Sequence, residues 1–114
     1  MMTRFLLFHQ AQDTTPAFAT AIQRHLDDEQ YRQLQIALML RPEQGPVIQA
    51  SGGLRKVRWA TTGGGKRGGL RVIYYWAPGD QAFYMLYAYT KSAQGDLTPA
   101  QTRQLSRIVR EEFK

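Results

Sequence analysis

The 114-residue chain has no cysteine and only two histidines, His9 and His25. The absence of thiols excludes disulfide bonds and thiolate metal sites, and it makes a reducing compartment the expected environment. His9 stands near the start of the chain and His25 at the end of a predicted helix, so they support neither a zinc site nor a pair of catalytic imidazoles. We therefore expect no metal ion and no small-molecule cofactor.

The chain also lacks a long hydrophobic run. No apolar stretch approaches the roughly 20 residues needed to cross a bilayer, and the first ten residues contain no small-residue cleavage site of a signal peptide. We therefore expect a cytoplasmic protein. The length predicts one domain over residues 1–114 with a single modest core, and 43% apolar with 21% charged residues is typical of a globular chain.

Acidic residues are missing from the middle of the chain, because no Asp or Glu occurs between Glu43 and Asp80. Six cations fall in this interval, as many as the net charge of +6: Arg55, Lys56, Arg58, Lys66, Arg67 and Arg71. Together with a sequence pI near 10.0, they favour a polyanionic partner: nucleic acid, the ribosome, an acidic protein or an anionic membrane. Of these, we do not expect the membrane. Without carboxylates among these cations, two-metal cleavage of a phosphodiester is not favoured.

Two β-branched and aromatic runs, Leu54 to Ala60 and Leu70 to Trp76, flank a glycine-rich loop with Lys66 and Arg67 at its tip. This pattern predicts a β-hairpin. The loop GGGKRGG lacks the spacing and the hydroxyl residue of a nucleotide-binding P-loop, so a nucleotide site is not expected.

Alternation along the predicted strands puts Lys56 and Arg58 on one face and their neighbours Val57 and Trp59 on the other. Arg71 opens the second strand on the side of Ile73 and Tyr75. Like charges that face each other across strands cost stability, so their presence requires a reason. We expect the hairpin cations to meet around the loop and to form a site for an anion.

Capping boxes, in which the residues at N-cap and N3 satisfy each other's backbone N–H groups, are predicted at Asp27 with Gln30 and at Thr98 with Gln101. The other expected elements are a strand from Arg4 to Phe8, a helix from Thr15 to about Leu26, a helix from Asp27 or Asp28 to Arg41, a loop from Glu43 to Gly53, a strand from Phe83 to Thr90, and a helix from Thr98 through Phe113 whose outer side carries Arg103, Arg107 and Arg110. Three consecutive strands favour an antiparallel meander, so the predicted class is α+β. We expect an antiparallel or mixed sheet of about four strands, with two N-terminal helices packed on one face and a C-terminal helix.

The segment GGLRKVRWATTGGGKRGGLRVIYYW, followed by FYMLYAYTKSAQGDLT and a terminal helix, resembles the RelE/HigB family of bacterial type II toxins, in particular its HigB-like branch. The resemblance covers the chain from about Asp27 to its end. It implies a RelE-like fold and a toxin that cleaves mRNA on the ribosome. It also implies a cognate HigA-like antitoxin with a helix-turn-helix domain.

The resemblance places Lys56 and Arg58 at the two basic positions of the family's first active-site strand. Arg71 matches the arginine that opens the next strand, and Lys91 matches the basic position that ends the last one. Arg71 and Arg58 are then expected to bind the scissile phosphate, and Lys56 or Lys91 to transfer a proton. Clustered cations suit cleavage without a metal, because they stabilise the charge that develops when a ribose 2′-OH attacks the adjacent phosphate.

The activator of the 2′-OH stays open. The RelE branch uses a C-terminal tyrosine, whereas the corresponding region here is Asp96-Leu97-Thr98, so Tyr75, Tyr89 and Lys56 are the alternatives. Contacts with RNA or the ribosome are expected from Arg55, Lys66, Arg67 and Tyr75. Two other functions are weighed beside the endonuclease: a toxin of the same fold that inhibits DNA gyrase, as the ParE relatives do, and a module that only binds nucleic acid.

Overall fold

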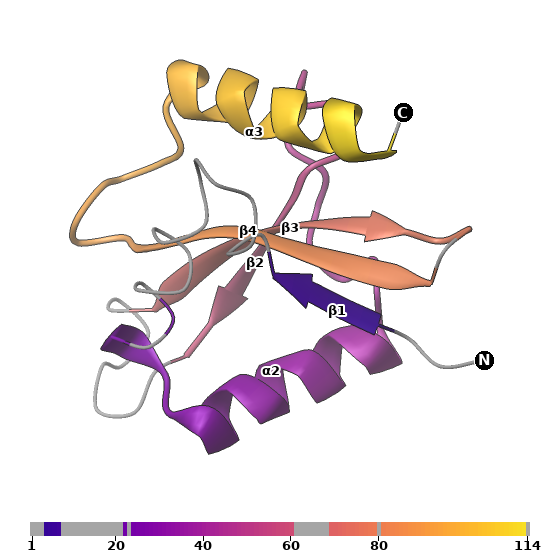
Figure 1. The fold of residues 1–114 in the computed structure, drawn as a ribbon. Helices are drawn as coiled ribbons and strands as arrows, with labels where there is room; N and C mark the ends of the chain where they lie inside the picture. Colours follow the sequence, from indigo (N-terminus) through magenta and orange to yellow (C-terminus); the bar gives the residue numbers. More distant parts are fainter. Residues whose placement is uncertain (1–3, 8–21, 23, 61–68, 80, 114) are drawn as a thin grey trace.

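The computed structural model describes residues 4–7, 22, 24–60, 69–79 and 81–113 (Figure 1). In chain order, its elements are β1 (Arg4–Leu7), α2 (Asp28–Leu40), β2 (Arg55–Trp59), β3 (Leu70–Ala77), β4 (Ala82–Thr90) and α3 (Pro99–Phe113). The strands form one sheet in the order β1-β4-β3-β2. Strands β2, β3 and β4 are antiparallel, as the meander predicted, and β1 lies parallel to β4. The predicted α+β class is confirmed.

Helix α2 begins at the predicted capping box. The Gln30 backbone N–H donates to the Asp27 carboxylate (2.7 Å), and the Asp27 N–H donates to the Gln30 side-chain oxygen (2.9 Å). The helix ends at Leu40, before Arg41 and Pro42, because a residue that precedes proline is disfavoured in the helical region. The first expected helix lies mostly outside the described residues, and so do Phe8 and the hairpin tip with Lys66 and Arg67.

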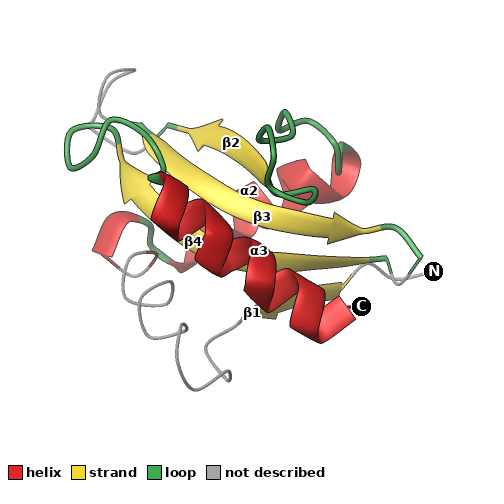
Figure 2. Ribbon diagram, turned by 90° about the horizontal axis from the view of Figure 1, so that it is seen from above, coloured by secondary structure: helices red, strands yellow, loops and turns green. Residues whose placement is uncertain are grey.

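The helices α2 and α3 lie on opposite faces of the sheet (Figures 1 and 2). Leu34 and Leu38 of α2 are fully buried in a core with Val57, Val72, Tyr74, Phe83 and Met85 of the sheet. Leu105 and Val109 of α3 cover the other face, which contributes Leu54, Ile73, Leu86 and Tyr89. A face of the sheet can therefore be named by the helix that covers it.

Helix α3 begins where the second capping box predicted. The Gln101 N–H donates to the Thr98 hydroxyl (3.1 Å), and the Thr98 N–H donates to the Gln101 side-chain oxygen (2.9 Å). No helix in the described part of the chain is long and apolar enough to span a membrane.

An irregularity in the β3–β4 ladder changes which side chains reach the α3 face. Ile73 is opposite Tyr87 but Tyr74 is opposite Met85, so Leu86 is an extra residue in β4. Such a bulge breaks the alternation of the strand. Consequently Leu86 and Tyr87 both contact the core on the α3 side.

Candidate nucleic-acid site

Three of the predicted catalytic cations lie on the α3 face of the hairpin. Arg58 of β2 is directly opposite Arg71 of β3, and Lys56 is opposite Ile73. Val57 and Trp59 contact the core on the α2 side, as the predicted alternation requires. The sequence-based assignment of Lys56, Arg58 and Arg71 to one face is therefore confirmed.

Arg71 is the most enclosed of these cations, with only 6% of its surface exposed. Its Nη1 donates to the carbonyl oxygen of Gly69 at 3.1 Å, whereas Arg58 is exposed. In the described part of the chain, neither arginine forms an ion pair with a carboxylate. A buried cation without an anionic partner is costly, so Arg71 is a candidate to bind an anion.

Lys56 has a partner that sequence reasoning missed. Its Nζ lies 3.3 Å from Oδ1 of Asp96, in the loop that leads to α3. The same oxygen accepts hydrogen bonds from the Tyr89 hydroxyl (3.4 Å) and the Leu97 backbone N–H (2.8 Å). The site therefore contains a carboxylate that comes from 40 residues further along the chain than Lys56.

These contacts determine the protonation states of Asp96 and Tyr89 at neutral pH. The bond from the Leu97 N–H and the one from Lys56 hold the pKa of Asp96 below its usual value, so its carboxylate is charged at neutral pH. Burial raises the pKa of Tyr89, and the neighbouring Asp96 raises it further, although Arg71 opposes this effect. The Tyr89 hydroxyl is therefore protonated at neutral pH and acts as a hydrogen-bond donor.

Lys91 follows directly after the end of β4, in an exposed turn. The last residue of β4, Thr90, pairs with Leu70, the first residue of β3 and the neighbour of Arg71. The backbone thus brings Lys91 to the end of the sheet where Arg71 stands. Tyr75 lies four residues after Arg71 in β3. It is half-buried in the core under α3 and lies beside Gly53.

Arg55 corrects the expectation that all six cations gather uncompensated around the hairpin loop. It is opposite Tyr74, so it lies on the face away from Lys56. Its Nη1 donates to the carbonyl oxygens of Gly45 (2.8 Å) and Glu43 (3.2 Å), and its Nη2 lies 3.5 Å from the Glu43 carboxylate. Arg55 is therefore paired and separated from the other cations, and Lys56 is paired as well.

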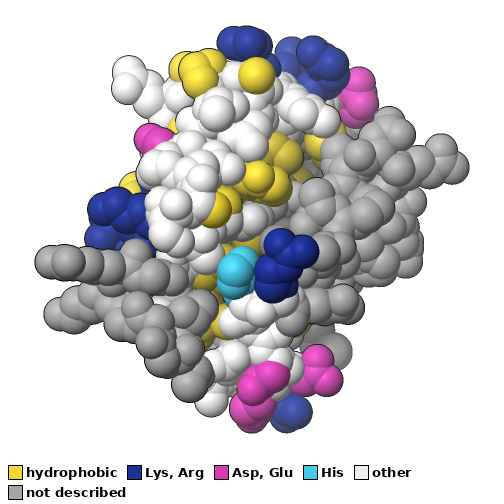
Figure 3. Space-filling model, turned by 90° about the vertical axis from the view of Figure 1, so that its left-hand side faces the viewer, with side chains coloured by type: hydrophobic (Ala, Val, Ile, Leu, Met, Phe, Trp, Pro, Cys, Tyr) yellow, Lys and Arg dark blue, Asp and Glu magenta, His cyan; other side chains and the backbone are white. Residues whose placement is uncertain are grey.

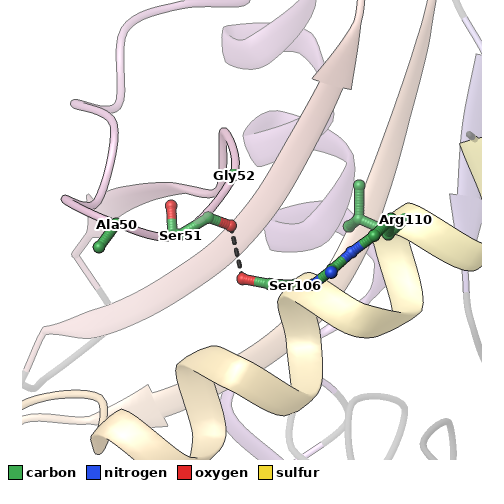
Figure 4. Close-up of a pocket in the computed structure, with 6 residues that line it drawn as sticks. Ala50, Ser51, Gly52, Ser106 and Arg110 are labelled. Carbon is green, nitrogen blue, oxygen red and sulfur yellow. Dashed lines mark hydrogen bonds between the residues drawn. The ribbon is translucent and has the colours of Figure 1, made fainter.

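Basic side chains also occur on α3, where Arg103, Arg107 and Arg110 are exposed as predicted. On the side of the molecule shown in Figure 3, Lys and Arg side chains are prominent at the α3 end and acidic ones at the end where α2 begins. A separate pocket of about 190 Å³ lies between α3 and the loop at Ser51. The Ser106 hydroxyl donates to the Ser51 carbonyl oxygen there at 2.5 Å (Figure 4), and no predicted catalytic residue lines this pocket.

A protein-family model matches most of the chain. The model of the RelE toxin of the RelE/RelB toxin-antitoxin system matches residues 17–114. The chain belongs to the RelE toxin family. The match confirms the resemblance noted from the hairpin and the last strand, at the level of the RelE family. This RelE-family protein is thus a toxin of a toxin-antitoxin system, and its partner is an antitoxin.

Proposed function

We propose that this RelE-family toxin is an endoribonuclease that cleaves mRNA on the ribosome and thereby blocks translation. The observation that carries the proposal is the facing pair of Arg58 and Arg71, which has no carboxylate partner among the described residues. Arginines at paired positions of neighbouring strands can both reach one phosphate, and arginine binds phosphate with paired hydrogen bonds. A messenger backbone supplies such a phosphate.

The reaction is an attack of the ribose 2′-oxygen on the adjacent phosphorus. The bond from phosphorus to the 5′-oxygen breaks, which leaves a 2′,3′-cyclic phosphate on one fragment and a 5′-OH on the other. The 2′-OH loses a proton and the leaving 5′-oxygen gains one. Cations stabilise the additional negative charge on the phosphate in the transition state.

Each basic residue has a proposed role in this reaction. Arg71 and Arg58 bind the scissile phosphate, and Lys56 or Lys91 transfers a proton. The raised pKa of Tyr89 and its hydrogen bond to Asp96 argue against Tyr89 as the activating base. The position of Tyr75 beneath α3 argues against Tyr75 in the same role. Lys56 is the alternative that remains, and as an ammonium group paired with Asp96 it is placed to donate a proton to the leaving 5′-oxygen.

The ribosome is proposed as the partner that orients the mRNA. A site with few groups for proton transfer gains most from a substrate held in line for attack, since orientation alone contributes several kcal/mol to catalysis. Lys66 and Arg67 at the hairpin tip are proposed to contact phosphates of the ribosome. The antitoxin is proposed to be HigA-like, with a helix-turn-helix domain, as the HigB-like branch implies.

Mapping of mRNA ends in bacterial cells after brief induction of the toxin tests the proposal. We expect cuts in phase with translated codons and with 5′-OH ends. Induction of Arg71→Ala is expected to give none, whereas Arg32→Ala, which alters an exposed arginine on α2, is expected to cut as the wild type does. DNA damage without RNA cuts would identify a gyrase inhibitor instead. If neither RNA cuts nor DNA damage appeared, the remaining function would be a module that only binds nucleic acid.

A further inference from the structure

A single carboxylate oxygen connects two strands of the candidate site. Oδ1 of Asp96 contacts Nζ of Lys56, which extends from β2, and the hydroxyl of Tyr89, which extends from β4. Strand β3 lies between these two strands, and its Arg71 is paired in register with Tyr89. Asp96 therefore reaches across the strand that carries the buried arginine.

The backbone at Asp96 is held by bonds that do not use its carboxylate. The Gln94 side-chain amide donates to the Asp96 carbonyl oxygen (2.7 Å) and to the side-chain oxygen of Gln101 (2.9 Å). The Tyr87 hydroxyl donates in turn to the Gln94 side-chain oxygen (3.2 Å). Because this network anchors the loop to β4 and α3, replacement of the Asp96 carboxylate leaves these anchors in place.

Stability accounts for only part of the contacts of the carboxylate, because the bond from the Leu97 N–H holds the loop whereas the contact with Lys56 adds little. The side chain of Asp96 is 73% exposed and that of Lys56 is 32% exposed. An exposed ion pair of this kind contributes only about 0–1 kcal/mol to folding. Affinity for RNA does not account for this contact either, since a negative charge beside Lys56 repels the phosphate that the site is proposed to bind.

We propose that Asp96 is a positioning residue, whose Oδ1 holds the Lys56 ammonium group and the Tyr89 hydroxyl in the orientation that cleavage requires. This inference rests on the proposed function, because the reaction that it serves is cleavage of mRNA. Asp96 contacts Lys56 and Tyr89, and its proposed action on the reaction runs through these two residues. Its removal should therefore slow the chemical step more than it weakens binding.

Single-turnover cleavage of mRNA on purified ribosomes separates these two effects. We expect Asp96→Asn to lower the maximal rate by about tenfold, since misplaced groups lose much of the benefit of orientation. The toxin concentration at half-maximal rate should stay the same or fall, because a repulsive charge has gone. Asp96→Ala, which also removes the acceptor for Tyr89, should be slower than Asp96→Asn. An unchanged rate, or a loss confined to binding, overturns the proposal.

The matched control is Glu43→Gln. It removes the negative charge from the other ion pair of β2. In that pair, the Glu43 carboxylate lies 3.5 Å from Arg55, on the opposite face of the sheet. We expect it to cleave at the rate of the wild type. A loss equal to that of Asp96→Asn would mean that any exposed pair on β2 affects the rate, and would overturn a specific role for Asp96.

A double-mutant cycle with Tyr89→Phe tests whether Asp96 acts through its contacts. Residues in one hydrogen-bond network have effects that do not add. The rate loss of Asp96→Ala combined with Tyr89→Phe should thus be smaller than the product of the two single losses. A loss equal to that product would show that the two residues act independently, and this result overturns the inference.

A measurement without RNA distinguishes failure of this inference from failure of the proposed function. The Tyr89 ring can be followed by NMR during a pH titration, with its signal identified by its absence in Tyr89→Phe. Asp96→Asn should lower the Tyr89 pKa, because the Asp96 carboxylate raises it by charge and by hydrogen bonding. An unchanged Tyr89 pKa overturns the inference alone. A wild type that leaves ribosome-bound mRNA intact overturns the proposed function, and the role of Asp96 in cleavage with it, even where the Tyr89 pKa shifts as expected.

Discussion

Arg58 and Arg71 lie directly opposite each other on neighbouring antiparallel strands, and Arg71 is almost completely buried. Like charges directly opposite each other repel and lower the stability of the sheet. The loss is roughly as large as the gain from a pair of opposite charges, about 0.2–1 kcal/mol. A pair that served only stability would combine an arginine with an acid. We therefore propose a functional explanation for the pair, an anion that binds between the two side chains.

Replacement of Arg71 by alanine is expected to abolish growth inhibition and to lower ribosome-dependent cleavage by about 100-fold or more, because a preorganised donor to the reacting phosphate is lost. The free energy of unfolding should not fall by more than about 1 kcal/mol, since the substitution also removes a buried charge that lacks a carboxylate partner among the described residues. Cleavage assays and thermal denaturation check the two effects. Growth arrest equal to that of the wild type would contradict the role of Arg71.

The hairpin shows how much of the site could be predicted from the sequence. Alternation along a strand is local, so the faces of Lys56, Arg58 and Arg71 followed directly from their spacing and from the pairing of two neighbouring runs. The helix starts at Asp27 and Thr98 were predictable for the same reason, since a capping box spans only four residues.

The partners of the cations could not be predicted in this way. Asp96 reaches Lys56 only because the loop after β4 returns over the α3 face, and the two residues are 40 positions apart in the chain. Glu43 reaches Arg55 because the Gly45 loop folds back along β2, where the Lys56 N–H donates to the Pro46 carbonyl oxygen. Tertiary contacts of this kind leave no periodic signal in the sequence.

Tyr89→Phe distinguishes a positioning hydroxyl from a catalytic base. The raised pKa of Tyr89 keeps the hydroxyl protonated at neutral pH, so its removal costs a hydrogen bond to Asp96 rather than the proton acceptor. We expect cleavage to slow by about three- to tenfold, which corresponds to one ordinary hydrogen bond. The pH dependence of the rate between pH 6 and 9, measured in the wild type and in Tyr89→Phe, should have the same shape. A loss of activity comparable to that of Arg71→Ala would make Tyr89 a catalytic residue.

The buried Tyr31 is expected to make the stability of the fold depend on pH in the alkaline range. Burial raises its pKa above the ordinary value of 10.0, and burial does the same for Tyr74. The unfolded chain therefore releases these protons at lower pH than the folded one does. Stability should be complete below about pH 10 and should fall as the pH rises above that value. Chemical denaturation between pH 8 and 11.5 measures this dependence.

Tyr31→Phe should reduce the alkaline loss of stability. The buried Tyr31 hydroxyl has no hydrogen-bond partner in the described part of the chain, so we also expect this variant to gain about 1 kcal/mol near neutral pH. The control is Tyr74→Phe, which removes bonds from the Gly45 N–H (3.1 Å) and to the Pro42 carbonyl oxygen (2.9 Å). That variant should be less stable by about 1–2 kcal/mol. If Tyr31→Phe and Tyr74→Phe changed the free energy of unfolding equally, the different roles assigned to the two hydroxyl groups would be wrong.

Gly45→Ala is expected to disturb the site from a distance. A Cβ atom on Gly45 would lie 2.9 Å from the Lys56 carbonyl oxygen, closer than such atoms approach in proteins, and a tight 3.1 Å from the ring of Tyr74. Because the carbonyl belongs to the backbone of β2, the strand must shift, at a cost of about 1–3 kcal/mol. We expect a lower melting temperature and slower mRNA cleavage, since the shifted residue carries the ammonium group of the site. The matched control is Gly79→Ala, where an added Cβ meets nothing within 4 Å. A Gly45→Ala protein with the stability and the rate of the control would show that the edge of β2 accommodates the methyl group, and the proposed coupling between this loop and Lys56 would then be wrong.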